Sequence, residues 1–157
     1  MPKVDEIALR VNGEDRTARA DAGAPLIHVL RNLLDLKATR YGCGQEQCGA
    51  CMVLLDGKPT FSCTFPAAEA VGREVETAEA LVSHPLREAF LELQAGQCGY
   101  CLSGILMSAK GLLDRTADPA REEIVAALDP HLCRCGAHER IIGAVALAAA
   151  RLRGAAA

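Results

Sequence analysis

Several features that would place a chain of 157 residues in a common class are scarce or missing. Tryptophan is absent and aromatic residues make up 3%, so a core must be filled by Leu, Ile, Val and Ala. The chain has no run of Lys and Arg and a net charge of −3, which gives no support to nucleic-acid binding, because that function needs a basic surface to neutralise phosphates. No apolar stretch reaches the roughly 18 residues of a membrane-spanning helix, so we expect no membrane span.

The first residues do not have the pattern of an export signal. Met1 is followed by acidic residues at Asp5 and Glu6, where a signal peptide has a basic and then an apolar segment. We therefore expect a cytoplasmic chain, with export to the periplasm on a signal-bearing partner as the alternative. Eight cysteines in such a chain favour metal or redox chemistry over disulfide bonds.

The eight cysteines fall into two groups of four, and none is left over. The first group has the spacing C-x4-C-x2-C with a fourth cysteine after eleven residues, and the second has C-x2-C, a long gap and C-x-C. The first spacing is that of plant-type ferredoxins, in which four thiolates hold one [2Fe–2S] cluster. We therefore predict two one-electron centres. Their ligands are Cys43, Cys48, Cys51 and Cys63 in the first group, and Cys98, Cys101, Cys133 and Cys135 in the second.

A structural zinc site is the alternative for each group, since zinc also binds four cysteines. Zinc ribbons favour two C-x2-C pairs, whereas the first group is asymmetric and interleaved with glycine at Gly42, Gly44 and Gly49. Glycine allows a loop to turn its N–H groups toward cluster sulfurs. The second spacing is less specific and leaves zinc open.

The apolar pattern changes character near Thr77. Before it, short alternating strands surround one helix, which is typical of a β-grasp sheet. After it, four short helices are predicted, and two of them fill the gap between Cys101 and Cys133 as an antiparallel pair that returns the C-x-C cysteines to the C-x2-C cysteines. We therefore predict an α+β chain, with a ferredoxin-like β-grasp domain over residues 1–76 and a four-helix-bundle domain over residues 77–157.

Individual helix boundaries follow from capping signals. Pro25 opens the helix of the first half, and its apolar face is expected to comprise Leu26, Leu30, Leu33 and Leu34. In the second half, Pro85 begins a helix that Gly96 ends, and His84 lies at its N-terminal boundary. Asp118 as N-cap, followed by Pro119, begins a later helix. None of the four histidines is accompanied by a carboxylate or serine pattern, so no catalytic role is assigned to them.

The cysteine segments resemble the cluster motifs of the small subunits of molybdenum hydroxylases, the family of xanthine and aldehyde oxidoreductases and their bacterial relatives. The resemblance covers nearly the whole chain, and both motifs are highly specific. It is carried by Tyr41-Gly-Cys-Gly-Gln-Glu-Gln-Cys-Gly-Ala-Cys51, by Gln97-Cys-Gly-Tyr-Cys101 and by Leu132-Cys-Arg-Cys135.

This resemblance implies a heteromeric electron-transfer function. A large molybdenum-binding partner would hold a molybdopterin cytosine dinucleotide cofactor, contacted by Gln97 and the Cys135 region, and would hydroxylate an N-heteroaromatic or aldehyde substrate. Electrons would pass to the helical cluster, then to the ferredoxin-like cluster, and then to a flavin subunit, to a cytochrome or to another acceptor. This chain would hold no catalytic residue. From the residues alone, a locally satisfied amide at Gln97 and a free two-cluster carrier without a partner remain alternatives.

Two departures from the family pattern are informative. Many members have glycine where Glu46 stands, so the first loop is expected to be less tight or its cluster potential shifted. Many also have Cys-Arg-Cys-Thr-Gly-Tyr where this chain has Cys133-Arg-Cys-Gly-Ala-His138. The second variant is similar to the branch of nicotinate and isoquinoline dehydrogenases.

Overall fold

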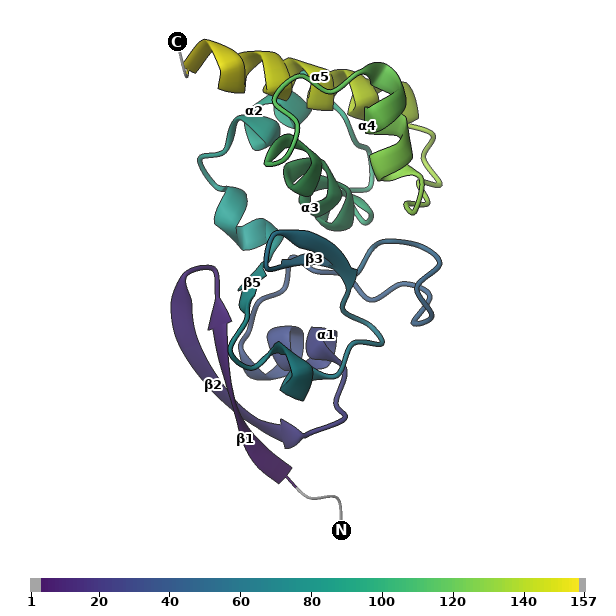
Figure 1. Ribbon diagram of the computed structural model, residues 1–157. Helices are drawn as coiled ribbons and strands as arrows, with labels where there is room; N and C mark the ends of the chain where they lie inside the picture. The colour runs from purple at the N-terminus through teal and green to yellow at the C-terminus, as the bar shows by residue number, and fades with distance from the viewer. Residues whose placement is uncertain (1–3, 156–157) are drawn as a thin grey trace.

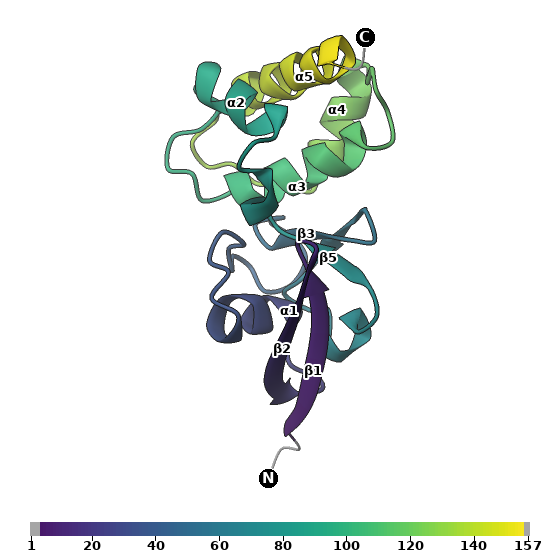
Figure 2. The same ribbon diagram turned by 90° about the vertical axis from the view of Figure 1, so that its left-hand side faces the viewer.

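The computed structural model describes residues 4–155 and shows a sheet-containing half followed by a helical half (Figures 1 and 2). The N-terminal end of the chain lies at the outer end of the first half, and the C-terminal end lies at the outer end of the second. The predicted mixed α+β class is confirmed. The two halves meet along one side of the sheet, so both cysteine groups can lie near a single junction.

A five-stranded sheet with the order β2-β1-β5-β3-β4 forms the first half. Its first two strands form the predicted hairpin, with left-handed φ values of 54° at Asn12 and 78° at Gly13. Strand β5 pairs with β1 in parallel and with β3 antiparallel. The strands are β1 (Val4–Val11), β2 (Glu14–Asp21), β3 (Met52–Leu55), β4 (Lys58–Phe61) and β5 (Glu74–Glu76).

The helix of the first half departs from the predicted pattern. Helix α1 (Leu26–His28) continues as a π-helical turn, η1 (Val29–Leu33), in which the Leu34 N–H donates to the Val29 carbonyl at 3.0 Å. The wider turn rotates later residues away from the α-helical face. Leu26 and Leu30 are fully buried as expected, but Leu33 is 50% exposed, and its assignment to the core was wrong.

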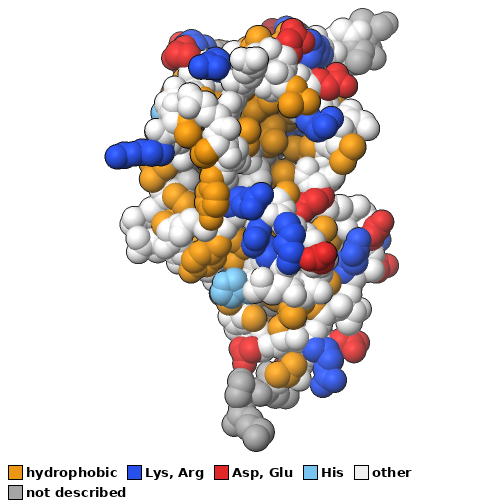
Figure 3. Space-filling model, turned by 180° about the vertical axis from the view of Figure 1, so that it is seen from behind, with side chains coloured by type: hydrophobic (Ala, Val, Ile, Leu, Met, Phe, Trp, Pro, Cys, Tyr) orange, Lys and Arg blue, Asp and Glu red, His pale blue; other side chains and the backbone are white. Residues whose placement is uncertain are grey.

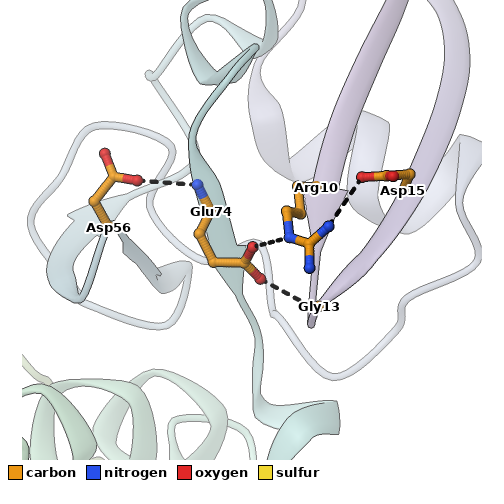
Figure 4. A network of polar contacts seen from close by, with 5 residues as sticks. All are labelled: Arg10, Gly13, Asp15, Asp56 and Glu74. Atoms are coloured by element: carbon orange, nitrogen blue, oxygen red, sulfur yellow. Dashed lines mark hydrogen bonds and ion pairs between the residues drawn. The ribbon is translucent and has the colours of Figure 1, made fainter.

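One polar network ties the short strand β5 to its neighbours (Figure 4). The Glu74 carboxylate accepts from the Gly13 N–H at 2.8 Å and pairs with Arg10 at 2.9 Å. The Glu74 N–H donates to the Asp56 carboxylate at 2.9 Å, and Arg10 also reaches Asp15. Because β5 has only three residues, these contacts add to few ladder hydrogen bonds in holding it between β1 and β3.

Four further helices build the second half around one apolar core, which includes Leu86, Ile105, Ile124 and Val145. His84 is confirmed at the start of the first of them, where its Nδ1 accepts from the Leu86 N–H at 3.1 Å. The helices are α2 (Pro85–Glu92), α3 (Leu102–Leu113), α4 (Arg121–Leu128) and α5 (His138–Ala155).

Two helix boundaries differ from the sequence prediction. Helix α2 ends at Glu92, and the left-handed residue after it is Gln94, with φ 48°, rather than Gly96. Helix α4 is capped at Ala120, whose N–H donates to the Glu123 carboxylate at 2.8 Å. Asp118 instead pairs with Arg153 on α5. A tertiary ion pair therefore replaces the local N-cap at Asp118.

The two halves are joined by a small apolar cluster that crosses the boundary. Met52 and Leu54 of β3 pack against Met107 of α3, together with Leu81 from the connecting segment. Lys110 of α3 adds an ion pair with Glu76 at 3.1 Å, where both side chains are mostly buried. The core of the contact is apolar, so the halves hold a fixed relation that positions the cysteine loops described next.

Candidate metal centres

The first cysteine group is built on an irregular loop between η1 and β3. Backbone φ is left-handed at Gly44, Glu46 and Gly49, with values of 70°, 61° and 72°. These turns direct N–H groups at sulfur, as the glycine spacing predicted. The Gln45 and Gln47 N–H groups donate to Cys43 Sγ at 3.4 and 3.2 Å.

Each sulfur of the first group has a near neighbour within the group. The Cys43 N–H donates to Cys48 Sγ at 3.3 Å and the two thiols interact, while the Cys51 and Cys63 thiols form a second interacting pair. The backbone donors, with Gln45 first, lower the pKa of the exposed Cys43 to about 7. Burial raises the pKa of Cys51 to about 12. The group therefore combines an exposed thiol that ionises readily with a buried pair.

The second group lies where two helices begin. Cys98 and Cys101 precede α3, and Cys133 and Cys135 precede α5. The chain between them folds back as predicted, so that Cys98 interacts with Cys135 and Cys101 with Cys133. The N-termini of both helices face the group, and their partial positive charge favours anionic thiolates.

The thiols of the second group are also split between exposed and buried. A backbone N–H from Tyr100 lowers the pKa of the exposed Cys98, and burial raises that of Cys101 to about 12. Burial also opposes ionisation of Cys133, but N–H groups beginning with that of Ala137 outweigh it and lower its pKa. As in the first group, backbone donors rather than basic side chains favour the charged sulfurs.

The donor set fits a two-iron cluster. In residues 4–155, no three His, Cys, Asp or Glu side chains gather closely enough for a single metal ion. The thiols meet as pairs instead, and a [2Fe–2S] cluster needs two thiolates on each iron. A half-open hollow of about 260 Å³ contacts all four cysteines of the second group and also Cys43 and Cys48.

Gln97 lies at the rim of this hollow and is exposed. Its Nε2 donates to the Cys135 carbonyl at 3.3 Å, across 38 residues of sequence. The amide therefore has a local partner, and it joins the two segments that carry the second group.

The loops of the two groups contact each other directly. The Leu132 N–H, next to Cys133, donates to the Cys48 carbonyl at 3.1 Å. A hydrogen bond of 2.6 Å joins the Tyr100 hydroxyl to the Tyr41 carbonyl. The two predicted cluster sites therefore belong to one connected structure.

His131 is a structural residue that the sequence analysis missed. It is buried, its Nε2 lies 2.7 Å from the Ser108 hydroxyl, and burial lowers its pKa to about 4. Its ring covers Gly49, where an added Cβ would lie 2.2 Å from Nδ1. Ser108 is 23 residues away in sequence, so only the return of the chain through α4 reveals the pair.

The surface near this junction is mixed in character. On the face in Figure 3, hydrophobic side chains emerge in the helical half and a group of Lys and Arg side chains lies where the halves meet. Tyr41, Tyr100 and Leu132 are large apolar residues that remain exposed beside the cysteine loops. No helix within residues 4–155 has the length and hydropathy needed to traverse a bilayer.

Comparison with known sequence families assigns a cluster-binding domain to each half. Residues 9–81 match the 2Fe-2S iron-sulfur cluster binding domain, and residues 73–146 match a [2Fe-2S] binding domain. The fold and the two thiol groups thus define a two-domain [2Fe–2S] protein.

Curated relatives narrow the class. The A chain of nicotinate dehydrogenase from Pseudomonas putida is 47% identical over 147 residues, covering 91% of this chain and 94% of the relative. The alpha chain of isoquinoline 1-oxidoreductase from Brevundimonas diminuta is 41% identical over 135 residues, covering 83% and 89%. Among solved structures, quinoline 2-oxidoreductase from Pseudomonas putida 86 superposes with a TM-score of 0.90 at 35% identity, covering 96% of this chain and 98% of that chain.

The chain belongs to the family of small iron–sulfur subunits of molybdenum hydroxylases. The aldehyde oxidoreductase of Megalodesulfovibrio gigas is 40% identical over 153 residues, but these make up 17% of that protein. The same unit therefore also occurs as part of a longer chain. The predicted family, and electron transfer as part of an oxidoreductase, are confirmed.

Proposed function

We propose that each thiol group holds one [2Fe–2S] cluster. Cys43 with Cys48, and Cys51 with Cys63, would bind the two irons of the first cluster. Cys98 with Cys135, and Cys101 with Cys133, would bind those of the second. The observation that carries this assignment is the meeting of all eight thiols as four pairs at two sites. When bound, the clusters supply one-electron redox chemistry, and the chain supplies ligands, N–H donors and burial.

We further propose the direction of electron flow. The second group would face the molybdenum-holding partner, because its hollow is half-open and bordered by the exposed Gln97. Gln97 and the Cys135 backbone would contact a molybdopterin cytosine dinucleotide held by that partner. The first group would release electrons, because Cys43 is exposed on its outer side. A flavin subunit or a cytochrome would accept them.

The substrate would be an N-heteroaromatic compound. Three of the similar proteins are named for nicotinate, isoquinoline and quinoline, and an aldehyde is the second class. We also propose a β-grasp domain over residues 1–76, a four-helix bundle over residues 77–157 and a cytoplasmic location.

Affinity purification from the native host tests the proposal, with analysis of iron, acid-labile sulfide, molybdenum and co-purifying chains. We expect a red-brown protein with about four irons per chain, two EPR signals after reduction, and a large molybdenum-binding partner. Colourless, zinc-containing material would contradict the cluster assignment. A cluster-loaded chain recovered alone would instead favour the free carrier.

A further inference from the structure

The loops that carry the two cysteine groups are held together on two sides. On the buried side, His131 covers Gly49, and an added Cβ at Gly104 of α3 would lie 2.0 Å from the Gly49 carbonyl oxygen. This fit is close and leaves little freedom. On the exposed side, the contact is a single side chain, that of Tyr100.

Tyr100 lies between two cysteines of the second group, and its hydroxyl reaches the first loop. The hydroxyl donates to the Tyr41 carbonyl at 2.6 Å, a short distance for an O–H···O bond. Tyr41 is two residues before Cys43, the most exposed position of the first group. The Arg40 guanidinium lies 6.0 Å from the Tyr100 ring centroid. This one hydroxyl therefore joins the outer edges of both predicted cluster sites.

The side chain of Tyr41 extends the contact into the first loop. An added Cβ at Gly44 would lie 2.3 Å from the Tyr41 hydroxyl oxygen, so this ring lies directly over the loop. The ring also faces His28, with 5.6 Å between centroids. Tyr41 and Tyr100 remain 46% and 49% exposed, so burial of apolar surface holds them only in part.

We propose that Tyr100 is a positioning residue, whose hydroxyl clasps the first cysteine loop against the second and so sets the relative placement of the two clusters. This inference rests on the proposed electron-transfer function and deepens it. Without the hydroxyl, residues 41–47 keep their attachment at Gly49 but lose their outer one. Both clusters then still bind, while the outer part of the first loop opens more often.

The test compares Tyr100→Phe with Tyr41→Phe in the full chain carrying its clusters. Tyr100→Phe removes the donor and keeps the ring. Tyr41→Phe removes a hydroxyl from the other ring and keeps the acceptor, which is a backbone carbonyl. For Tyr100→Phe we expect amide hydrogen exchange over residues 41–47 to rise about five-fold, the effect of one typical hydrogen bond, with a similar rise in the rate at which a chelator removes the first cluster. Tyr41→Phe should leave both rates within about two-fold of the parent.

A spectroscopic measurement separates positioning from general loosening. With both clusters reduced, the magnetic interaction between them depends on their separation, so Tyr100→Phe should change the low-temperature EPR line shape and Tyr41→Phe should not. Parent-like exchange and EPR in Tyr100→Phe would overturn the clasp, and so would equal changes in both variants. Parent protein without iron and sulfide would overturn the proposed function, while the exchange comparison would still decide whether the hydroxyl holds the loop.

Discussion

The two cysteine groups bring four thiols together by different routes. In the first, three cysteines lie within residues 43–51, and left-handed backbone turns gather them locally. In the second, Cys98 and Cys135 lie far apart in sequence and meet only because α3 and α4 fold back on each other. A loop-built site thus depends on backbone conformation, whereas the site before the helices depends on helix packing.

Despite these routes, the groups share an electrostatic plan. Each has an exposed thiol of lowered pKa, Cys43 or Cys98, and a buried thiol whose pKa is raised to about 12, Cys51 or Cys101. The lowered values come from backbone N–H groups, which also would stabilise cluster sulfurs. Convergence on this pattern indicates that the N–H donors, rather than the local fold, define the chemistry.

The largest expected effect is loss of one cluster while the other is retained. Cys51→Ser should abolish the first EPR signal and Cys101→Ser the second, and each should lower iron from about four to about two atoms per chain. Iron analysis and EPR of the reduced variants provide the check. Loss of both signals from either single variant would show that the groups do not assemble independently.

The next effect is acid sensitivity, through His131 at the junction. Its folded pKa of about 4 lies below the ordinary value of 6.5, so both folded and unfolded chains hold it neutral above pH 6.5. Below that pH the unfolded chain takes up the proton first, so stability falls as pH decreases toward 4. This group should cost roughly 2 kcal/mol between about pH 7.5 and pH 5.

Urea unfolding at these two pH values measures the difference. His131→Asn should lower stability at the higher pH, because the contact with Ser108 is altered, but should show a smaller further loss at the lower pH. An identical pH dependence in the variant and the parent would rule out His131 as the source.

A substitution at Gly104 tests the seat between the two groups. Gly104→Ala places a methyl group against the Gly49 carbonyl, and we expect a loss of about 1–3 kcal/mol from overpacking. Gly143→Ala on α5 is the matched control, since its Cβ would meet only Leu93, at 3.5 Å. That variant should be neutral or stabilised by up to about 1 kcal/mol. Equal urea midpoints for the two variants would contradict the close fit.

The smallest effect concerns the loop at Glu46. This residue is left-handed, and its carboxylate accepts from the Thr64 hydroxyl next to Cys63. Glu46→Ala loses the hydrogen bond and keeps the backbone strain, whereas Glu46→Gly loses the bond and relieves the strain. The Gly variant should therefore be the more stable of the two by about 1 kcal/mol in urea unfolding. The opposite order would show that the loop holds no strain at this position.

Part of the structure followed from local pattern, and the misses have identifiable causes. Alternation at Ile7, Leu9 and Val11 predicted β1 correctly, because one face of that strand is buried. The apolar face ending at Leu33 failed because a π turn changed the period. Asp118 failed as a cap because its carboxylate pairs with Arg153, which is distant in sequence.

Cysteine spacing alone was enough to predict two separate four-thiol groups and the family, since ligand spacing reports how a short segment can wrap around a cluster. The distribution of burial among the thiols, the contact of His131 with Ser108 and the bond from Tyr100 to Tyr41 emerged only when the halves were packed together. These features join residues far apart along the chain, and their energies depend on solvent exclusion and on distances that no local pattern encodes.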